Sequence, residues 1–107
     1  GYLFIGSGDD GNSHSHAGVG FIVDPIARRN IITYRQESSR MAMLKIRSSR
    51  GKIAIITAYA PPQTSSHTFQ ERQDFFQSLS LFWHSISCNG PKFIFGDLNI
   101  HNPDFMI

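Results

Sequence analysis

Most of the chain consists of short stretches in which apolar residues alternate with other residues or follow one another without a break. Stretches of this length, separated by glycine, proline, serine and asparagine, are typical of β-strands. Residues 25–29 are long enough for one helical turn. The predicted strands cover residues 2–5, 18–23, 31–36, 40–47, 52–60 and 92–97.

The stretch 40–47 alternates most strictly, so that each face of the predicted strand takes every second residue. Both faces are largely apolar, and we therefore expect this strand to be covered on both sides. A compact turn at residues 48–51 joins it to the stretch 52–60, and the two stretches together predict a β-hairpin. One face carries Met41, Met43 and Lys45, and the other carries Ala42, Leu44 and Ile46.

One long stretch has the period of a helix instead. Thr68 and Glu71 have the spacing of a capping box, which predicts where this helix begins. Gly90, after Asn89, suits a left-handed cap at its end, and Pro91 prevents the helix from continuing. Hairpin, helix and strand in this order predict a fold that mixes helices and strands, α/β in the broad sense that includes α+β. We expect a mixed sheet with a helix packed outside it. The apolar stripe, expected in the core, consists of Phe75, Phe76, Leu79, Phe82, Trp83 and Ile86.

The composition fits one globular domain. The chain has 107 residues, of which 40% are hydrophobic and 17% charged, and this excludes a disordered chain. Its single cysteine, Cys88, excludes an internal disulfide and favours a reducing, intracellular compartment. No apolar run approaches the length of a membrane span, so we expect no membrane partner. The net charge of +2 is compatible with a polyanionic partner without requiring one.

The motif KFIFGDLN, residues 92–99, brings polar side chains to the end of an apolar strand. Since side chains alternate along a strand, Asp97 and Asn99 are expected to point the same way, and Gly96 lets the backbone pass closely before them. A carboxylate beside an amide suits the handling of a water, a metal ion or a phosphate oxygen. The structural alternative is an Asx turn, because Asp and Asn often end strands in this way.

Tyr59 lies in the motif TAYAPP, residues 57–62, at the end of an apolar strand and before two prolines. Its phenol can donate to a phosphate oxygen, whereas the ordinary alternative is a half-buried packing residue whose hydroxyl binds water. If this strand neighbours the strand that ends at Asp97, the two carboxyl ends open on the same side of the sheet. That is where α/β proteins place their sites.

Four blocks in sequence order, with the predicted helix between the last two, resemble the endonuclease/exonuclease/phosphatase superfamily. The likeness is greater to its apurinic and non-LTR retrotransposon endonuclease branch. The resemblance implies a four-layer α/β sandwich with mixed, largely antiparallel β-sheets and outer helices. The blocks are HAGVGFIV at residues 16–23, SSRMAMLKI at 38–46, TAYAPP at 57–62 and FGDLN at 95–99.

The resemblance implies a metal-dependent phosphodiesterase that nicks DNA by in-line attack of water on a backbone phosphate. Asp97 would orient or deprotonate the water, Asn99 would hold the scissile phosphate or a ligand of the metal, and Tyr59 would hydrogen-bond the phosphate. Asp97 and Asn99 would share Mg²⁺ or Mn²⁺, and Arg40 would contact the phosphate less directly. The partner would be the DNA backbone, with no obligate protein partner, in the nucleus if the chain derives from a retroelement.

The resemblance also implies residues outside the chain. They are a metal-binding glutamate on a strand upstream of Gly1 and an Asp-His pair well beyond Asn99. We therefore interpret residues 1–107 as a single partial domain, the middle of a longer one, and expect the isolated chain to be inactive. Without the remaining strands, apolar faces of the sheets are expected to be uncovered.

Two other functions stay open. A phosphatase of the same superfamily, acting on phosphoinositides or other small phosphoesters, also has a GDLN strand, although TAYAPP does not resemble that branch. A catalytically dead remnant or a nucleic-acid-binding module would agree with the missing glutamate and histidine. Basic residues give only a weak footprint for a phosphate backbone. Their local concentration consists of Arg28, Arg29, Arg40, Arg47, Arg50 and Lys52.

The histidines form no evident metal site. His14 and His16 have a spacing that puts both on one face of an extended segment, but they lie in a glycine- and serine-rich loop, where solvated side chains are the ordinary interpretation. His101 follows the GDLN motif, whereas the catalytic histidine of the resemblance comes from a later strand. Loops 6–16 and 63–67 carry no recognisable code for reading DNA, so abasic-site and target-site nicking both stay open.

Overall fold

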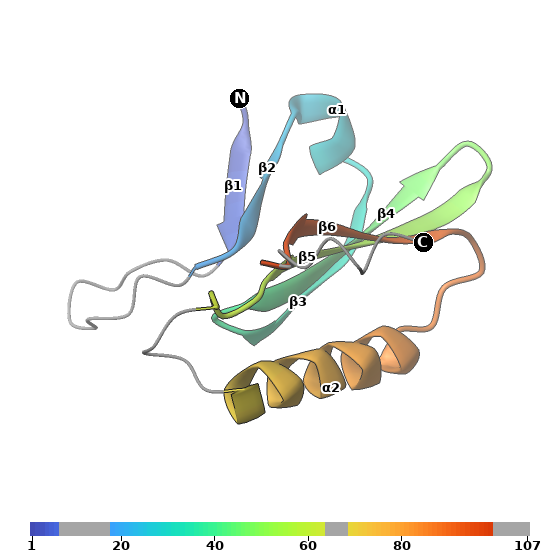
Figure 1. The fold of residues 1–107 in the computed structure, drawn as a ribbon. Coiled ribbons are helices and arrows are strands. Elements are labelled where there is room, and N and C mark those ends of the chain that lie inside the picture. Colours follow the sequence, from blue (N-terminus) through green and yellow to red (C-terminus); the bar gives the residue numbers. More distant parts are fainter. Residues whose placement is uncertain (7–17, 64–68, 100–107) are drawn as a thin grey trace.

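The computed structural model describes residues 1–6, 18–63 and 69–99, which form an α+β fold with two β-sheets (Figure 1). All predicted strands are present, and so is the helical turn near residue 25. No helix in the described part of the chain is long and apolar enough to cross a membrane. The elements are β1 (Leu3–Gly6), β2 (Gly20–Val23), α1 (Pro25–Arg28), β3 (Ile31–Ser38), β4 (Met41–Ser48), β5 (Gly51–Tyr59), α2 (Phe69–Ser85) and β6 (Lys92–Asp97).

The larger sheet is mixed, with the strand order β3-β4-β5-β6. Its first three strands are antiparallel neighbours, so the hairpin predicted from the sequence is confirmed. β6 is parallel to β5, and a parallel neighbour can be reached only through a crossover connection. The segment that contains α2 supplies this crossover and returns the chain along one face of the sheet (Figure 1). β5, which leads into the TAYAPP motif, and β6, which leads into the FGDLN motif, are therefore neighbours.

Both faces of the larger sheet are covered at its centre. α2 packs on one face, and the β1–β2 sheet lies on the opposite side (Figure 1), where Phe21 meets Tyr34 edge-on with ring centroids 6.3 Å apart. Burial raises the pKa of Tyr34 above its ordinary value. Ala42 and Leu44 are buried on this second face, as predicted for a strand covered on both sides. The four-layer sandwich that the resemblance implies stays a prediction.

The core lies between α2 and the sheet. Alternate residues of β4 and β5 point at the helix, and small alanines on β5 let the helix approach closely. Ile56 is the largest fully buried side chain among the described residues. The core consists of Met41, Met43, Ala54, Ile56, Ala58 and Ala60 from the sheet side and Phe75, Leu79, Phe82 and Ile86 from the helix side.

The helix ends earlier than the sequence indicates. Its last residue is Ser85, so the predicted end at Asn89 and Gly90 is wrong, and Thr68 of the predicted capping box lies outside the described residues. The Lys92 ammonium donates to the carbonyl oxygens of Trp83 at 2.9 Å and Ile86 at 3.3 Å. The ammonium thus binds a carbonyl of the last helical turn, which also accepts from the Ile86 amide at 3.3 Å, and the carbonyl of the residue just after the helix, so the helix ends without a left-handed glycine.

Gly90 has a different function from the predicted cap. It is not among the described glycines with positive φ, and a Cβ atom built on it would lie 1.9 Å from the Lys52 carbonyl oxygen. The residue therefore lets the chain cross closely over the start of β5 before β6 begins. Only a glycine fits such a close backbone approach.

β6 is an edge strand with an exposed aromatic face. Phe93 is 43% exposed and Phe95 is 61% exposed, and their rings stack with centroids 6.0 Å apart. Monomeric proteins usually cover or charge a strand of this kind. The expectation that part of the apolar sheet surface is uncovered is therefore confirmed within the described residues.

We predict that Ile56→Ala lowers the free energy of unfolding by about 2–5 kcal/mol, because the substitution leaves a cavity between the sheet and α2. Urea unfolding followed by the fluorescence of Trp83 measures the change. The matched control is Ile22→Ala, whose side chain is 76% exposed and whose loss should stay within about 0.5 kcal/mol. Equal losses in the two variants would contradict a core on the helix side of the sheet.

Candidate active site

The candidate site lies at the carboxyl ends of β5 and β6. These strands run in parallel, and Tyr59 is the register partner of Asp97. Register partners in a sheet point to the same face, and Ala58 and Ala60 on either side of Tyr59 belong to the core beneath α2. Tyr59 and Asp97 therefore share the face opposite the helix. The sequence hypothesis that the two motifs come together is confirmed.

Gly96 makes this pairing possible. Its φ is +151°, and a Cβ atom built on it would lie 1.8 Å from the carbonyl oxygen of Ala58. Any side chain at this position would push β6 away from β5 and separate Asp97 from Tyr59. The predicted close passage of the backbone is therefore present. One step further along, the Ala60 amide donates to the Asp97 carbonyl oxygen at 2.9 Å and continues the parallel ladder beyond β5.

Asp97 and Asn99 are arranged in a turn rather than along one strand. β6 ends at Asp97, and Asn99 adopts a left-handed backbone conformation with φ of +51°. The Asn99 amide donates to Asp97 Oδ1 at 2.9 Å, which closes an Asx turn. Strand alternation therefore does not extend to Asn99, and the structural alternative, an Asx turn, describes the backbone. Asn tolerates this conformation better than most residues.

The Asx turn leaves part of each side chain unused. Asn99 Nδ2 donates to the Ala60 carbonyl oxygen at 2.7 Å, and this fixes the orientation of the amide because a carbonyl can only accept. No hydrogen bond within the described residues engages Asn99 Oδ1 or Asp97 Oδ2. Asp97 is exposed, whereas Asn99 is half-buried. Within the described part of the chain, each residue thus uses one polar group to hold the turn and keeps one oxygen without a hydrogen bond.

Arg40 lies directly against Tyr59. Its guanidinium carbon is 5.2 Å from the centre of the tyrosine ring, and Nη1 donates to the Tyr59 carbonyl oxygen at 3.2 Å. The Tyr59 amide in turn donates to the Arg40 carbonyl oxygen at 2.8 Å. The structure therefore brings Arg40 to the site, where it fixes the tyrosine and adds a positive charge beside it.

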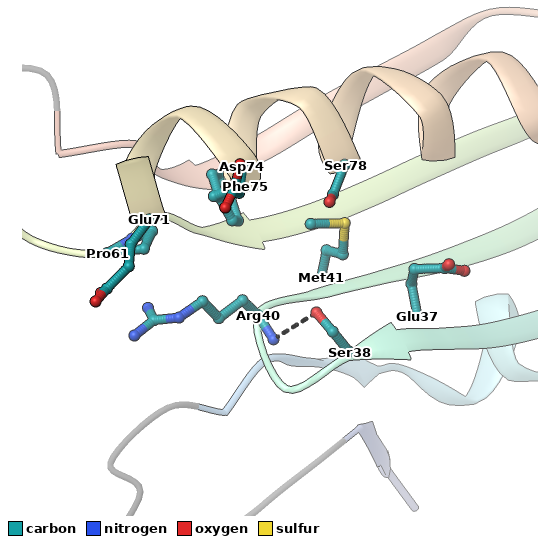
Figure 2. A pocket seen from close by; sticks show the side chains of 9 residues that line it. All are labelled: Glu37, Ser38, Arg40, Met41, Pro61, Glu71, Asp74, Phe75 and Ser78. Atoms are coloured by element: carbon teal, nitrogen blue, oxygen red, sulfur yellow. Dashed lines mark hydrogen bonds between the residues drawn. The ribbon is translucent and has the colours of Figure 1, made fainter. Parts of the chain in front are cut away.

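A pocket of about 450 Å³ lies next to the site, between the β3–β4 turn and the first half of α2 (Figure 2). Figure 2 shows the Arg40 guanidinium directed toward Pro61 and Glu71, while the Arg40 amide bonds Ser38 Oγ at 3.1 Å. The pocket is acidic, because the carboxylates of Glu37, Glu71 and Asp74 border it. Arg40 lies between this pocket and the ring of Tyr59. None of Tyr59, Asp97 and Asn99 lines this pocket. Its lining consists of Glu37, Ser38, Arg40, Met41, Pro61, Glu71, Asp74, Phe75 and Ser78.

Arg72 is the residue of this region that sequence reasoning misses. From α2 its guanidinium reaches both loops of the site, because Nε donates to the Pro61 carbonyl oxygen at 3.2 Å and Nη2 donates to the Asn99 carbonyl oxygen at 3.0 Å. The same side chain lies over the Phe76 ring, 5.7 Å from its centre. In the sequence it resembles any polar residue of an amphipathic helix. Only its position one turn before Phe76 hints that it points inward.

The free oxygens of Asp97 and Asn99 have the chemistry of ligands for Mg²⁺ or Mn²⁺. Both are hard oxygen donors, and Mg²⁺ in proteins is often held by one or two carboxylates while it keeps several waters. Within the described residues no three His, Cys, Asp or Glu side chains come together as a metal site. Among the described residues, Asp97 and Asn99 therefore offer two oxygen donors at this site and no third ligand from these residue types. His14, His16, His67 and His101 lie outside the described residues.

No model of a known protein family matches the chain, and no curated protein matches its sequence. What the site can do is therefore inferred from its own residues and contacts. Those contacts join two strand ends, one tyrosine, two oxygen donors and two arginines.

We predict that Asn99→Ala destabilises the protein more than Asn99→Gly. Both variants lose the bond to Ala60, worth about 0.5–1.5 kcal/mol, but alanine must also adopt the left-handed conformation, at a cost of roughly 1–2 kcal/mol. Urea unfolding of the two variants measures the difference directly. An alanine variant as stable as the glycine variant would contradict the left-handed turn at this position.

Proposed function

We propose that this chain carries part of the active site of a metal-dependent phosphodiesterase that nicks DNA, of the retrotransposon endonuclease kind. The observation that supports this most strongly is the register pairing of Tyr59 with Asp97 at the carboxyl ends of two parallel strands. A phenol donor and a carboxylate on one face suit hydrolysis of a phosphodiester, which is accelerated by a positioned base and by fixed hydrogen-bond donors to the phosphate. The resemblance of the TAYAPP and FGDLN motifs supports the same class of reaction.

Asp97 is the general base of the proposed reaction. Its Oδ1 is bound to the Asn99 amide, and this bond orients the carboxylate. The remaining oxygen, on an exposed residue, accepts the proton of the attacking water. Positioned bases of this kind typically contribute about 10²–10⁴-fold to a rate.

Tyr59 donates its hydroxyl to a non-bridging oxygen of the phosphate. Arg40 lies over its ring and binds its carbonyl oxygen, so the phenol is held in one orientation before the substrate arrives. The positive charge of Arg40 also stabilises an anionic phosphate bound next to the tyrosine hydroxyl. Arg40 thus combines support of Tyr59 with the weaker phosphate contact expected from the sequence.

Asn99 would hold Mg²⁺ or Mn²⁺ through its Oδ1, and Asp97 would contribute the negative charge of its carboxylate to the same ion while Oδ2 acts as the base. When bound, such an ion supplies Lewis-acid stabilisation of the charge that develops on the phosphate. The Asn99 amide is fixed by its bond to Ala60, so its Oδ1 is directed before any ligand binds. This preorganisation favours the amide oxygen as a ligand at low entropic cost.

The proposal extends to the partner and the architecture. DNA is the proposed substrate, bound through its backbone in an intracellular compartment, which is the nucleus if the chain derives from a retroelement. The exposed Phe93 and Phe95 support a further layer over β6, as in a four-layer sandwich. In this interpretation residues 1–107 belong to a longer domain, and the isolated chain has little or no activity.

The test is Mg²⁺-dependent nicking of supercoiled plasmid by the longest chain encoded in the same reading frame, beside the 107-residue chain. Asp97→Asn should lower the nicking rate by about 10²–10⁴-fold, because it removes the base while keeping its shape. Tyr59→Phe should lower it by about 10²-fold through loss of one donor to the phosphate. EDTA should abolish nicking in every case.

Matched substitutions elsewhere separate chemistry from folding. Asp74→Asn removes a carboxylate of α2 that is bound by Gln70, and Tyr34→Phe removes a phenol of β3; both variants should keep the full rate. Hydrolysis of a small phosphoester with no nicking would favour the phosphatase alternative. A longer chain that cleaves neither substrate, or an Asp97→Asn variant with the full rate, would contradict the proposal.

A further inference from the structure

Arg72 joins the two loops that carry the candidate site. The loop after β5 is held through the carbonyl oxygen of Pro61, and the loop after β6 is held through the carbonyl oxygen of Asn99, at 3.2 and 3.0 Å. Both loops have already left the sheet at these residues, so regular strand pairing no longer fixes their separation. Beyond the ends of the strands, the Arg72 guanidinium therefore helps to fix the distance between the two loops.

The hydrogen bonds around Arg72 all connect the segment that follows β5 with the end of β6 and the loop after it. The Ala60 amide binds the Asp97 carbonyl oxygen at 2.9 Å, and Asn99 Nδ2 binds the Ala60 carbonyl oxygen at 2.7 Å. Arg72 adds the third connection between the same two segments. Because it binds the carbonyl of Asn99 itself, it acts directly on the residue whose left-handed conformation closes the Asx turn.

An arginine suits this position for geometric reasons. Its planar guanidinium presents several N–H donors in a fixed fork, so two carbonyl oxygens from different segments can be bound at once. The Phe76 ring beneath the guanidinium limits its movement, and the core residues Phe75 and Leu79 anchor the helix that carries it. Both acceptor carbonyls are uncharged, so the charge of Arg72 is not cancelled by a carboxylate in these contacts.

We propose that Arg72 is a positioning residue for the candidate site. It holds Asn99 in the left-handed conformation and thereby directs Asn99 Oδ1 and keeps the Asp97 carboxylate in the Asx turn. The consequence for catalysis rests on the proposed function, whereas the effect on the geometry of Asn99 does not. Arg72 acts through Asn99 and Asp97 and needs no contact with the substrate.

The geometry is tested by NMR on the full ¹⁵N-labelled chain with Arg72→Met, which keeps an apolar stem over Phe76 and removes the fork. The exchange rate of the Asn99 backbone amide should rise at least about tenfold relative to that of Ile56, as loss of one hydrogen bond from a charged group predicts. The strong HN–Hα NOE of a left-handed residue should be lost at Asn99. Arg72→Lys, which keeps the charge, should restore part of the protection.

The matched control is Arg35→Met. Arg35 lies over the Phe82 ring at 5.0 Å and also binds Ser85, so the variant loses a comparable contact with α2 far from the site. It should leave Asn99 unchanged. Equal effects of the two variants on Asn99, or an unchanged Asn99 in Arg72→Met, would overturn the proposal.

Kinetics on the nicking-competent chain supply the functional readout. Arg72→Met should lower kcat by about tenfold with little change in KM, because the substrate still binds while the base and the amide oxygen are misdirected. A raised KM with unchanged kcat would overturn a positioning role. If no chain nicks, the proposed function fails, and the NMR comparison still decides whether Arg72 positions Asn99.

Discussion

The candidate site depends on the close parallel pairing of β5 with β6. The strands meet in register from Ala54 and Lys92 to Tyr59 and Asp97, and Gly96 passes so close to Ala58 that a Cβ atom built on it would lie 1.8 Å from the Ala58 carbonyl oxygen. A side chain at Gly96 would separate the strands at the position just before the site. The geometry of Tyr59 and Asp97 is thus a direct consequence of backbone contact and does not depend on any bond between their side chains.

The helix α2 links the core to the site. Its buried face packs against the larger sheet in the core, and the crossover that contains it makes the parallel pairing topologically possible. Lys92 binds the carbonyl oxygen of Trp83 near one end of the helix, and Arg72 near the other end binds the two site loops. Stability and site geometry therefore share one element, so a loss of helix packing should also disturb the turn at Asn99.

Each polar residue of the site has one group that holds the structure and another that makes no hydrogen bond within the described residues. Asp97 uses one oxygen to close the turn, Asn99 uses its amide nitrogen to bind Ala60, and Tyr59 uses its backbone to bind Arg40. Because one group of each residue is bound in this way, the directions of Asp97 Oδ2, Asn99 Oδ1 and the Tyr59 hydroxyl are restricted before a ligand binds. Preorganised donors and acceptors of this kind cost little to align when a charged substrate binds.

The sequence by itself determined the strands, the central hairpin and the apolar stripe of α2, because their alternation and helical period follow from local backbone geometry. It also indicated Tyr59, Asp97 and Asn99, since each ends or follows an apolar strand. Only the tertiary structure decided where α2 ends, because Lys92, from the next strand, binds the carbonyl oxygens of Trp83 and Ile86 on either side of the helix end at Ser85. The turn at Asn99 and the role of Arg72 were likewise decided by contacts with segments distant in sequence, which no local pattern records.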